Sequence, residues 1–510
     1  MAQSQQQRIE KPIIKITGGK LPESVDQAEQ ALLRHSSSIY QRGGLLVRAL
    51  VSNTKARRGI KRAANALTIQ QVEIPYLIER LTQVARWQKF DARQDAWKDV
   101  DCPKNIAETY LARCIWNVPE LFGVIEAPTL RPDGSILDKP GYDEETGLLF
   151  YPGRTVFLPI PENPTKDDGF KALGIFKELL KGFSFVSDVD FAVALSAILT
   201  ALIRRSIRTA PLHGFSAPKM GSGKSLLADI VAMIIAGRAA AVMSQADSPE
   251  EEKKRLLSVL MEGDPVIVID NIERPLGSDA LCSILTQETW KERLLGKNKT
   301  MTVPTNVAFL ATANNLTFQG DLSTRAMLCM LDPQCERPEE REFDINLYNY
   351  IPEVRSELVK AGLTILRAYH IAGRPKQNIP TFGRFEEWSS WVRSALIWLG
   401  LADPCQSRKR IEDADPVRTN LKALLTNWHI CIKGAVTLKE LVQTATAKAH
   451  ENEDLYDAIS EIAGEKGEIN QRKLGKYLKS LQGRIENGLR LEQFGKRNNN
   501  ILWRVKDINS

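Results

Sequence analysis

A chain of 510 residues is long enough for about three to four domains of ordinary size. Its hydrophobic fraction of 43% and charged fraction of 26% exclude a fibrous or intrinsically disordered protein. The net charge of +7 permits binding to nucleic acid without requiring it. The N-terminus lacks an apolar signal core, and no apolar run reaches the roughly 18 residues of a membrane span. These features predict a cytoplasmic protein with no membrane partner. Seven scattered cysteines without a C-x-x-C pair predict reduced thiols and no zinc site.

Turn-forming sequences interrupt the first part of the chain, which predicts a mixed α+β N-terminal domain over residues 1–165. The stretch 161–169 is rich in proline and aspartate and is predicted to be a linker. Residues 191–203 are apolar and predict a buried helix. Asp188 and Asp190 before this helix and Arg204 and Arg205 after it complement the helix dipole.

Short apolar runs alternate with helical stretches between residues 211 and 332, which predicts an α/β fold with a parallel sheet. The expected strands are 212–216, 240–244, 266–270 and 307–313, and the expected helices are 225–236, 249–262 and 279–289. We predict an ATPase core with preceding helices over 170–335, a helical region over 336–433 and a separate domain over 434–510.

A phosphate-binding loop is predicted at residues 217–225, between the first of these strands and the first helix. The residues that match the end of the G-x-x-x-x-G-K-S pattern are Gly221, Ser222, Gly223, Lys224 and Ser225. Pro218 replaces the first glycine of the pattern. Backbone N–H groups of such a loop, at a helix N-terminus, bind phosphate oxygens. We expect Lys224 to contact the phosphates of ATP and the Ser225 hydroxyl to coordinate Mg²⁺.

Polar residues follow the later strands where the carboxyl ends of a parallel sheet meet. Asp270 ends an apolar strand and is predicted to hold Mg²⁺, with Glu273 as the candidate that polarises the attacking water. Asn314 and Asn315 end the next strand and are candidates to orient that water. Arg325, ten residues on, is predicted to stabilise transition-state charge on the nucleotide of a neighbouring subunit.

Four motifs follow one another in the chain, at 221–225, 266–271, 311–316 and 320–325. Together they resemble the AAA+ helicase proteins of bacteriophages and integrated mobile elements, which are related to superfamily 3 and poxvirus-type primase-helicases. The resemblance covers most of residues 120–405. It implies an AAA+ P-loop core and an ATP-dependent DNA helicase that acts as a ring, as a homo-hexamer, in replication with 3′ to 5′ movement. Thr324 stands where relatives tend to have a second arginine. Relatives often carry a primase module, but no primase-like acidic pattern precedes residue 211, so priming activity is not carried over to this chain. A separate primase or replication initiator is an expected partner.

A strand-turn-strand pattern spans residues 292–303, with Lys297 and Lys299 on either side of Asn298 at its turn. Lysine at a turn is commonly only soluble surface. In the helicases that this chain resembles, an insertion here projects into the central pore and contacts single-stranded DNA. Both interpretations stay open at this point.

Three helices and a basic hairpin are predicted near the end of the chain, at 438–447, 455–463, 471–481 and 489–505. This order predicts a winged helix that binds duplex DNA through phosphate contacts. The expected contact residues are Arg472, Lys473, Lys476, Lys479, Lys496 and Arg497. A winged helix that binds protein is the alternative.

Two other functions are consistent with these motifs. One is a DNA-binding replication initiator or regulatory AAA+ ATPase that does not unwind processively. The other is an AAA+ remodelling protein that does not act on DNA, which would require the basic C-terminal segment to have no role.

Overall fold

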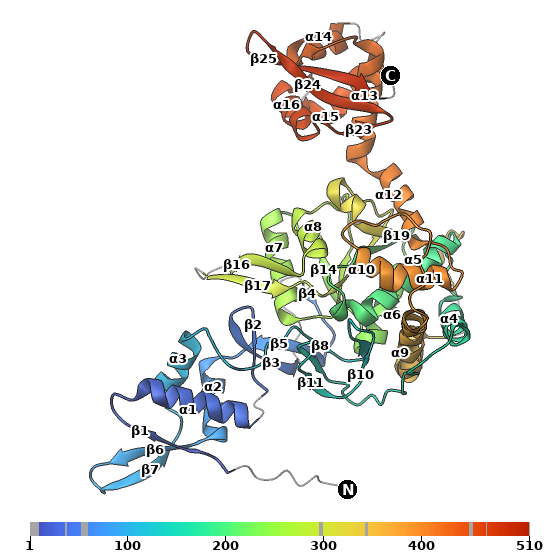
Figure 1. Cartoon of the computed structure of the whole chain (residues 1–510). Helices are drawn as coiled ribbons and strands as arrows, with labels where there is room; N and C mark the ends of the chain where they lie inside the picture. Colours follow the sequence, from blue (N-terminus) through green and yellow to red (C-terminus); the bar gives the residue numbers. More distant parts are fainter. Residues whose placement is uncertain are drawn as a thin grey trace. The chain divides into compact units, whose positions relative to one another are not determined.

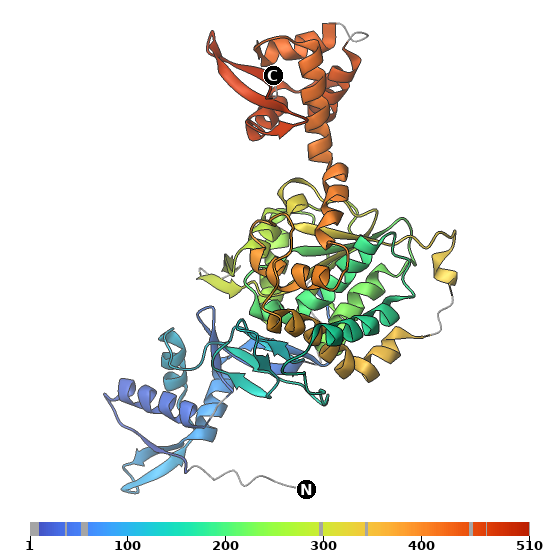
Figure 2. The ribbon, with the colours of Figure 1, turned by 45° about the vertical axis from the view of Figure 1, so that its right-hand side comes forward.

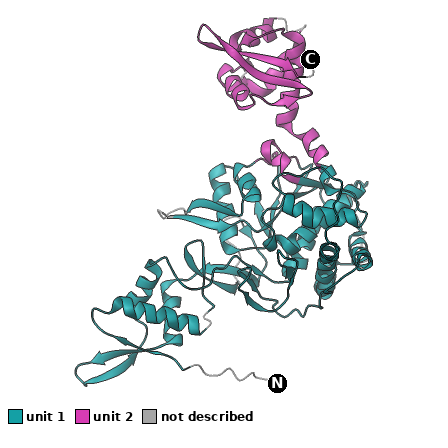
Figure 3. Cartoon of the chain, in the orientation of Figure 1, with its two compact units in different colours: residues 1–273, 278–316, 327–407 teal, residues 274–277, 317–326, 408–510 magenta. Residues whose placement is uncertain are grey.

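The computed structural model describes residues 10–35, 38–52, 60–294, 299–341, 345–447, 452–465 and 467–508. The chain forms two compact units, which Figure 3 distinguishes by colour. Unit 1 comprises Met1–Glu273, Ser278–Leu316 and Met327–Ser407, and unit 2 comprises Arg274–Gly277, Thr317–Ala326 and Arg408–Ser510. The four domains expected from the sequence, divided near residues 165, 335 and 433, stay a prediction. Within the described ranges, no helix has both the length and the apolar character that crossing a membrane requires.

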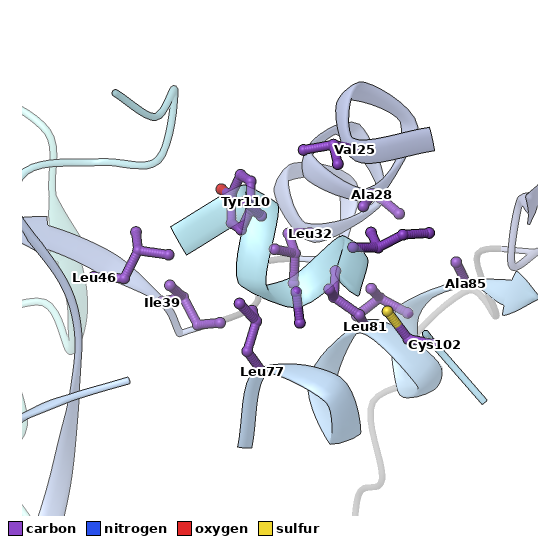
Figure 4. Packing of buried hydrophobic residues seen from close by; sticks show 14 of the residues in the cluster. Val25, Ala28, Leu32, Ile39, Leu46, Leu77, Leu81, Ala85, Cys102 and Tyr110 are labelled. Carbon is purple, nitrogen blue, oxygen red and sulfur yellow. The ribbon is translucent and has the colours of Figure 1, made fainter. Parts of the chain in front are cut away.

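The N-terminal part of unit 1 begins with a three-stranded sheet in the order β1-β6-β7. Its strands are β1 (Ile13–Ile16), β6 (Arg86–Asp91) and β7 (Ala96–Val100). Three helices cover one side of this sheet in Figure 1: α1 (Leu21–Arg34), α2 (Ile74–Val84) and α3 (Lys104–Ala112). Figure 4 shows the apolar core between these helices, with Leu32, Leu81 and Tyr110 packed together. Burial of this apolar surface is the main stabilisation of the segment.

Short strands occupy the rest of this region. They are β2 (Tyr40–Arg42), β3 (Leu45–Ser52), β4 (Ile60–Lys61), β5 (Ala66–Gln71), β8 (Gly123–Ile125), β9 (Thr129–Leu130), β10 (Ile136–Leu137), β11 (Gly141–Asp143) and β12 (Leu148–Phe150). Strand β4 pairs antiparallel with a strand of the central sheet, so the segment predicted as an N-terminal domain contributes an edge strand to that sheet. Arg62 follows β4 and pairs with the buried Asp264, 2.8 Å from Nε to Oδ1.

The central sheet has six strands within the described residues, in the order β19-β13-β18-β15-β14-β4. Its strands besides β4 are β13 (Leu212–Ala217), β14 (Ala241–Ser244), β15 (Val266–Asp270), β18 (Ala308–Asn314) and β19 (Ala326–Met330). β13, β18, β15 and β14 pair in parallel, which confirms the expected mixed α/β class. β13, β15 and β18 are buried almost throughout, as expected of a parallel sheet that is covered on both faces.

The helices predicted at 225–236 and 249–262 form, whereas the helix predicted at 279–289 ends at Thr286, because Thr289 already begins a strand. Helices make up much of this part of unit 1. They are α4 (Lys166–Leu180), α5 (Asp188–Ile203), α6 (Lys224–Ala236), α7 (Pro249–Glu262), α8 (Asp279–Thr286), α9 (Leu347–Ile371), α10 (Glu386–Trp388) and α11 (Ser394–Trp398). The apolar helix α5 is buried, as expected. The predicted linker 161–169 is shorter than expected, because Thr165 and Asp168 form a capping box that begins α4 at Lys166. The predicted strand-turn-strand is the antiparallel pair β16 (Thr289–Leu294) and β17 (Lys299–Pro304).

Unit 2 has a core of its own around Leu424, Trp428 and Trp503. Its helices are α12 (Arg408–Ala414), α13 (Pro416–Cys431), α14 (Leu438–Ala447), α15 (Glu453–Ala463) and α16 (Gln471–Ser480). Its strands are β20 (Val436–Thr437), β21 (Gly464–Glu465), β22 (Glu468–Ile469), β23 (Ile485–Glu486), β24 (Leu489–Arg497) and β25 (Asn500–Asp507). The hairpin β24–β25 lies beside the helices in both views (Figure 1 and Figure 2). Asn498 and Asn499 have positive φ values of 50° and 63°, so the turn is tighter than the predicted 495–500.

Candidate nucleotide-binding site

The loop between β13 and α6 has the backbone conformation that its glycines predict. Gly221 and Gly223 have φ values of 72° and 92°, in the left-handed region that side chains disfavour. A Cβ atom at Gly221 would lie 2.8 Å from the backbone nitrogen of Glu339, so glycine is also required by close packing. The Ser222 hydroxyl donates to the Lys219 carbonyl oxygen at 2.8 Å and holds the loop closed. Ser225 is exposed in the first turn of α6.

Helix α6 is fixed at its other end by a buried arginine. The Arg355 guanidinium on α9 donates to the carbonyl oxygens of Ile234 at 3.0 Å and Ile235 at 2.7 Å. These carbonyls lie in the last turn of α6, where helical partners are missing. A positive charge there also stabilises the helix dipole. The helix that carries Lys224 is therefore held rigidly at both ends.

The Lys224 ammonium group contacts two oxygens across the sheet edge. Its Nζ atom donates to the Lys219 carbonyl and to Asn314 Oδ1, each at 2.8 Å. Burial lowers the pKa of Lys224, and the negative charge of Asp270 opposes this shift. Since Asn314 ends β18, the strand next to β13, this contact brings together two residues that the sequence separates by ninety positions.

Asp270 ends β15 on the other side of β18. Its Oδ1 atom accepts a hydrogen bond from the Thr312 hydroxyl, which orients the carboxylate. Sequence reasoning missed Thr312, although the register Ile269 to Ala311 puts it beside Asp270. Asn271 follows with a positive φ of 55°, so the chain turns sharply after the strand. The end of β15 therefore holds the Asp270 carboxylate in a fixed orientation.

A cavity of about 520 Å³ opens beside the loop and is lined by residues 221–226. Its other walls include Phe183, Arg341, Asn346 and Tyr348. Arg341 donates to the Gly182 carbonyl oxygen at 3.1 Å. This volume lies within the range of about 300 to 1,000 Å³ that is common for ligand sites. The mixture of aromatic, cationic and amide groups suits a molecule with both a ring system and negative charge.

A second carboxylate lies one turn along α6 from Ser225. Asp229 accepts a hydrogen bond from the Tyr348 hydroxyl at 2.7 Å. Burial raises the pKa of Asp229, the hydrogen bonds from Tyr348 and the Ala240 N–H oppose this shift, and the charge of Asp270 adds to it. Residues four apart share a helix face, so the spacing from Ser225 could have indicated Asp229. Tyr348 could not be predicted, because α9 reaches this face only in the folded protein.

The oxygen donors near the loop are compatible with Mg²⁺. Ser225 supplies a hydroxyl, and Asp270 supplies a carboxylate of which Thr312 occupies one oxygen. Mg²⁺ prefers such hard oxygen ligands and commonly uses one or two protein groups together with water and phosphate oxygens. The donor set therefore fits the predicted role of these two residues.

The remaining predicted residues of the site lie as follows. Asn315 is exposed with a φ of 49°, and its backbone N–H donates to the Ala217 carbonyl oxygen at 3.0 Å. Glu273 is exposed, three residues after β15. Arg325 belongs to unit 2, where its guanidinium lies 3.6 Å from Asp321 Oδ2. Asn314 and Asp270 thus lie near Lys224, whereas the roles of Asn315, Glu273 and Arg325 stay predictions.

The predicted DNA contacts fall into two groups. Lys297 lies outside the described residues, and Lys299 begins β17. On α16, the basic residues Arg472, Lys473, Lys476 and Lys479 are exposed, opposite the buried Leu474 and Leu478. Lys496 is exposed in β24, whereas Arg497 is paired with Glu440. The cationic face of α16 is consistent with the predicted phosphate contacts.

Comparison with known proteins finds no matching family model and no matching curated protein. Among solved structures, the apo A form of the NrS-1 C-terminal region is 12% identical over 93% of this chain and 98% of that chain, with a TM-score of 0.37. A second structure of that region, covering 305–718, is 13% identical over 94% and 98%, with a TM-score of 0.38. The JCV helicase is 13% identical over 49% of this chain and 73% of that chain, with a TM-score of 0.22. Similarity at this level carries no argument about function.

Proposed function

We propose that the protein is an ATP-dependent DNA helicase that acts as a ring-shaped homo-hexamer in the replication of a phage or mobile genetic element. One observation carries the nucleotide part of the proposal. The Lys224 ammonium, the Asn314 amide and the Asp270 carboxylate gather at one edge of a parallel sheet, beside a cavity of about 520 Å³. Ligands of open α/β sheets bind at this edge.

The chemistry of the residues supports ATP hydrolysis. Lys224 would exchange its contacts with Lys219 and Asn314 for phosphate oxygens, and would neutralise charge that develops during transfer. Ser225 and Asp270 would hold Mg²⁺, which supplies further positive charge at the phosphates. Asn315 and Glu273 are proposed to orient and polarise the attacking water. A fixed helix and a fixed carboxylate favour hydrolysis because their geometry needs no reorganisation during the reaction.

Single-stranded DNA is proposed to pass the β16–β17 hairpin, with Lys297 and Lys299 as its contacts. Arg325 of a neighbouring subunit is proposed to complete each nucleotide site. The order of the motifs supports this assembly, since a ring places each nucleotide at an interface between subunits. A separate primase or initiator remains the proposed partner.

Strand displacement tests the helicase proposal directly. The full chain with ATP and Mg²⁺ is expected to release the labelled strand from a duplex that carries a 3′ single-stranded tail. Release from a duplex with a 5′ tail should be much slower, if movement is 3′ to 5′. A Lys224→Ala variant is the negative control. ATP hydrolysis and DNA binding without any strand release would instead favour a replication initiator or regulatory ATPase.

The exposed cations of α16 favour duplex binding, which both of these functions would use. We expect Lys476→Ala/Lys479→Ala to weaken binding to duplex DNA and to reduce its salt dependence. Losing two phosphate contacts should reduce the slope of log K against log salt by about 1.8. Titrations across a range of salt concentrations measure this slope.

Lys422→Ala/Lys439→Ala removes two exposed lysines from α13 and α14 of the same unit and is the matched control. Its slope should equal that of the unmodified chain. Equal slopes for both double variants would exclude α16 as a phosphate-binding helix.

A further inference from the structure

The β1-β6-β7 sheet has one covered face and one uncovered face. Ile14 on β1 and Trp87 on β6 are buried in the core that the helices complete. Side chains alternate along a strand, so Ile13 and Lys15 on β1, and Phe90 on β6, lie on the opposite face. The helices α1, α2 and α3 all lie on the covered side (Figure 1). The outer face is therefore exposed among the described residues of the chain.

Two aromatic side chains lie next to each other on this outer face. The register pairs Phe90 with Trp97 across β6 and β7. Their ring centroids are 5.6 Å apart with an interplanar angle of 64°, and the two residues are 44% and 37% exposed. Aromatic residues of this size are usually well buried. Since the core beneath is already filled by Trp87, folding does not account for a second aromatic layer outside it.

The charge around the aromatic pair is positive. On the outer face the strands carry the cations Lys15 and Arg86 against one carboxylate, Asp99. Asp99 is already neutralised, because its Oδ2 atom lies 2.8 Å from Arg86. Lys15 lies with its Nζ atom 4.8 Å from the centre of the Trp97 ring. Lys15 has no acidic partner among the described residues.

We propose that this outer face binds single-stranded nucleic acid, with bases stacked on Phe90 and Trp97 and a phosphate held by Lys15. Exposed aromatic rings beside a cation match the two requirements of a single strand, which are π-faces for the bases and positive charge for the backbone. Duplex nucleic acid does not fit, because its bases are already stacked. A docking face for protein would not need an uncompensated ammonium group beside the rings. This binding requires neither ATP nor a ring.

The first test locates the contact in the full chain without nucleotide. A short oligonucleotide that contains 5-iodouracil is bound and irradiated, and the crosslinked peptides are identified by mass spectrometry. Iodouracil crosslinks efficiently to aromatic residues on which it stacks. The expected crosslinks lie at Phe90 or Trp97, and deoxyribose and ribose versions compare DNA with RNA as the ligand. Absence of crosslinks in β6 and β7, while other peptides react, would overturn the proposal.

The second test separates stacking from general apolar contact. Binding of labelled oligothymidylate is measured by fluorescence anisotropy for Phe90→Ala/Trp97→Ala, for Phe90→Leu/Trp97→Leu and for Phe90→Tyr/Trp97→Phe. We expect a loss of at least about tenfold in affinity for the alanine and leucine variants, because stacking on each ring contributes substantially. The third variant keeps both aromatic faces and should keep its affinity.

The matched control is Tyr151→Ala/Phe170→Ala, which removes two aromatic residues that are 47% and 46% exposed elsewhere in unit 1. It should bind as the unmodified chain does, and circular dichroism should show all variants folded. Full affinity in the leucine variant would identify the face as a docking site for an apolar partner and overturn the proposal. Unchanged affinity in the alanine variant would overturn it as well.

Discussion

Replacing Lys224 by alanine is expected to abolish ATP hydrolysis, with a loss of at least about a hundredfold in turnover. The ammonium group lies at the end of the loop and donates a hydrogen bond to Asn314 Oδ1 at the end of β18. Without it, charge that develops on the phosphates has no compensating group at this position. Steady-state phosphate release by the full chain measures the effect.

Lys219→Ala is a matched control for this variant, because Lys219 lies in the same loop but is exposed. Its Nζ atom contacts only the Glu336 carbonyl oxygen, at 3.3 Å, among the contacts of its side chain in the described residues. Its turnover should remain close to normal. Equal loss in both variants would point to disruption of the loop, and undiminished turnover in Lys224→Ala would disprove the nucleotide-site assignment.

Stability provides an independent readout of the same variant. Burial lowers the pKa of Lys224, which means that the fold holds this ammonium group at an energetic disadvantage. Alanine removes that disadvantage and also two hydrogen bonds. We therefore expect the Lys224→Ala protein to unfold at a similar temperature without nucleotide, so that lost activity reflects lost chemistry. Thermal unfolding with and without ATP distinguishes the two effects, since only the unmodified site should be stabilised by ligand.

The part of the site that is contiguous in sequence could be predicted without a structure. Gly221, Gly223 and Lys224 form one short pattern whose backbone and charge requirements are local. Asp270 could be expected near them because it ends an apolar strand. Thr312 and Tyr348 could not be predicted, because a threonine within a strand and a tyrosine at the start of a helix have no local signal. Their contacts exist only through the β15–β18 register and the return of α9 to the site.

The fold, too, could be predicted only where the sequence signal is local. Helix α7 has a serine cap, a proline in its first turn and Gly263 at its end, and its predicted bounds agree with those observed. Strand β4 has only two residues and pairs with a strand about 180 positions later, at Ile60 with Met243. No local sequence pattern predicts such a pairing. The exposed pair Phe90 and Trp97 was missed for a related reason, since only the register of β6 with β7 brings the rings together.

Arg325→Ala is expected to retain nucleotide binding and lose hydrolysis, by up to about a thousandfold. The reason is that an arginine placed at a neighbour's nucleotide contributes mainly in the transition state. Within its own unit, the Arg325 guanidinium is 11% exposed and lies 3.6 Å from Asp321, which is 66% exposed. An ion pair with such an exposed partner contributes little, so this contact alone does not fix the guanidinium in place. Binding of a fluorescent ATP analogue and phosphate release measure the two properties separately.

Asp321→Ala is the control for this variant, because it removes the partner and keeps the arginine. Its hydrolysis should be retained if Arg325 acts on a nucleotide. If Arg325 were only a structural partner of Asp321, the two variants would lose activity together. Arg325→Lys should recover part of the turnover, since it keeps the charge but not the planar geometry of the guanidinium group.

Mixing two inactive proteins tests whether Arg325 acts between subunits. Arg325→Ala keeps an intact Lys224 site, and Lys224→Ala keeps an intact Arg325. When an equal mixture assembles randomly into rings, an intact Lys224 site meets an intact Arg325 of the neighbouring subunit at about a quarter of the interfaces. This is because each subunit in a head-to-tail ring presents different surfaces to its two neighbours. Some hydrolysis should therefore return on mixing. A mixture as inactive as its components, with subunit exchange confirmed by mass spectrometry, would remove both the role between subunits and the main support for a ring-shaped motor.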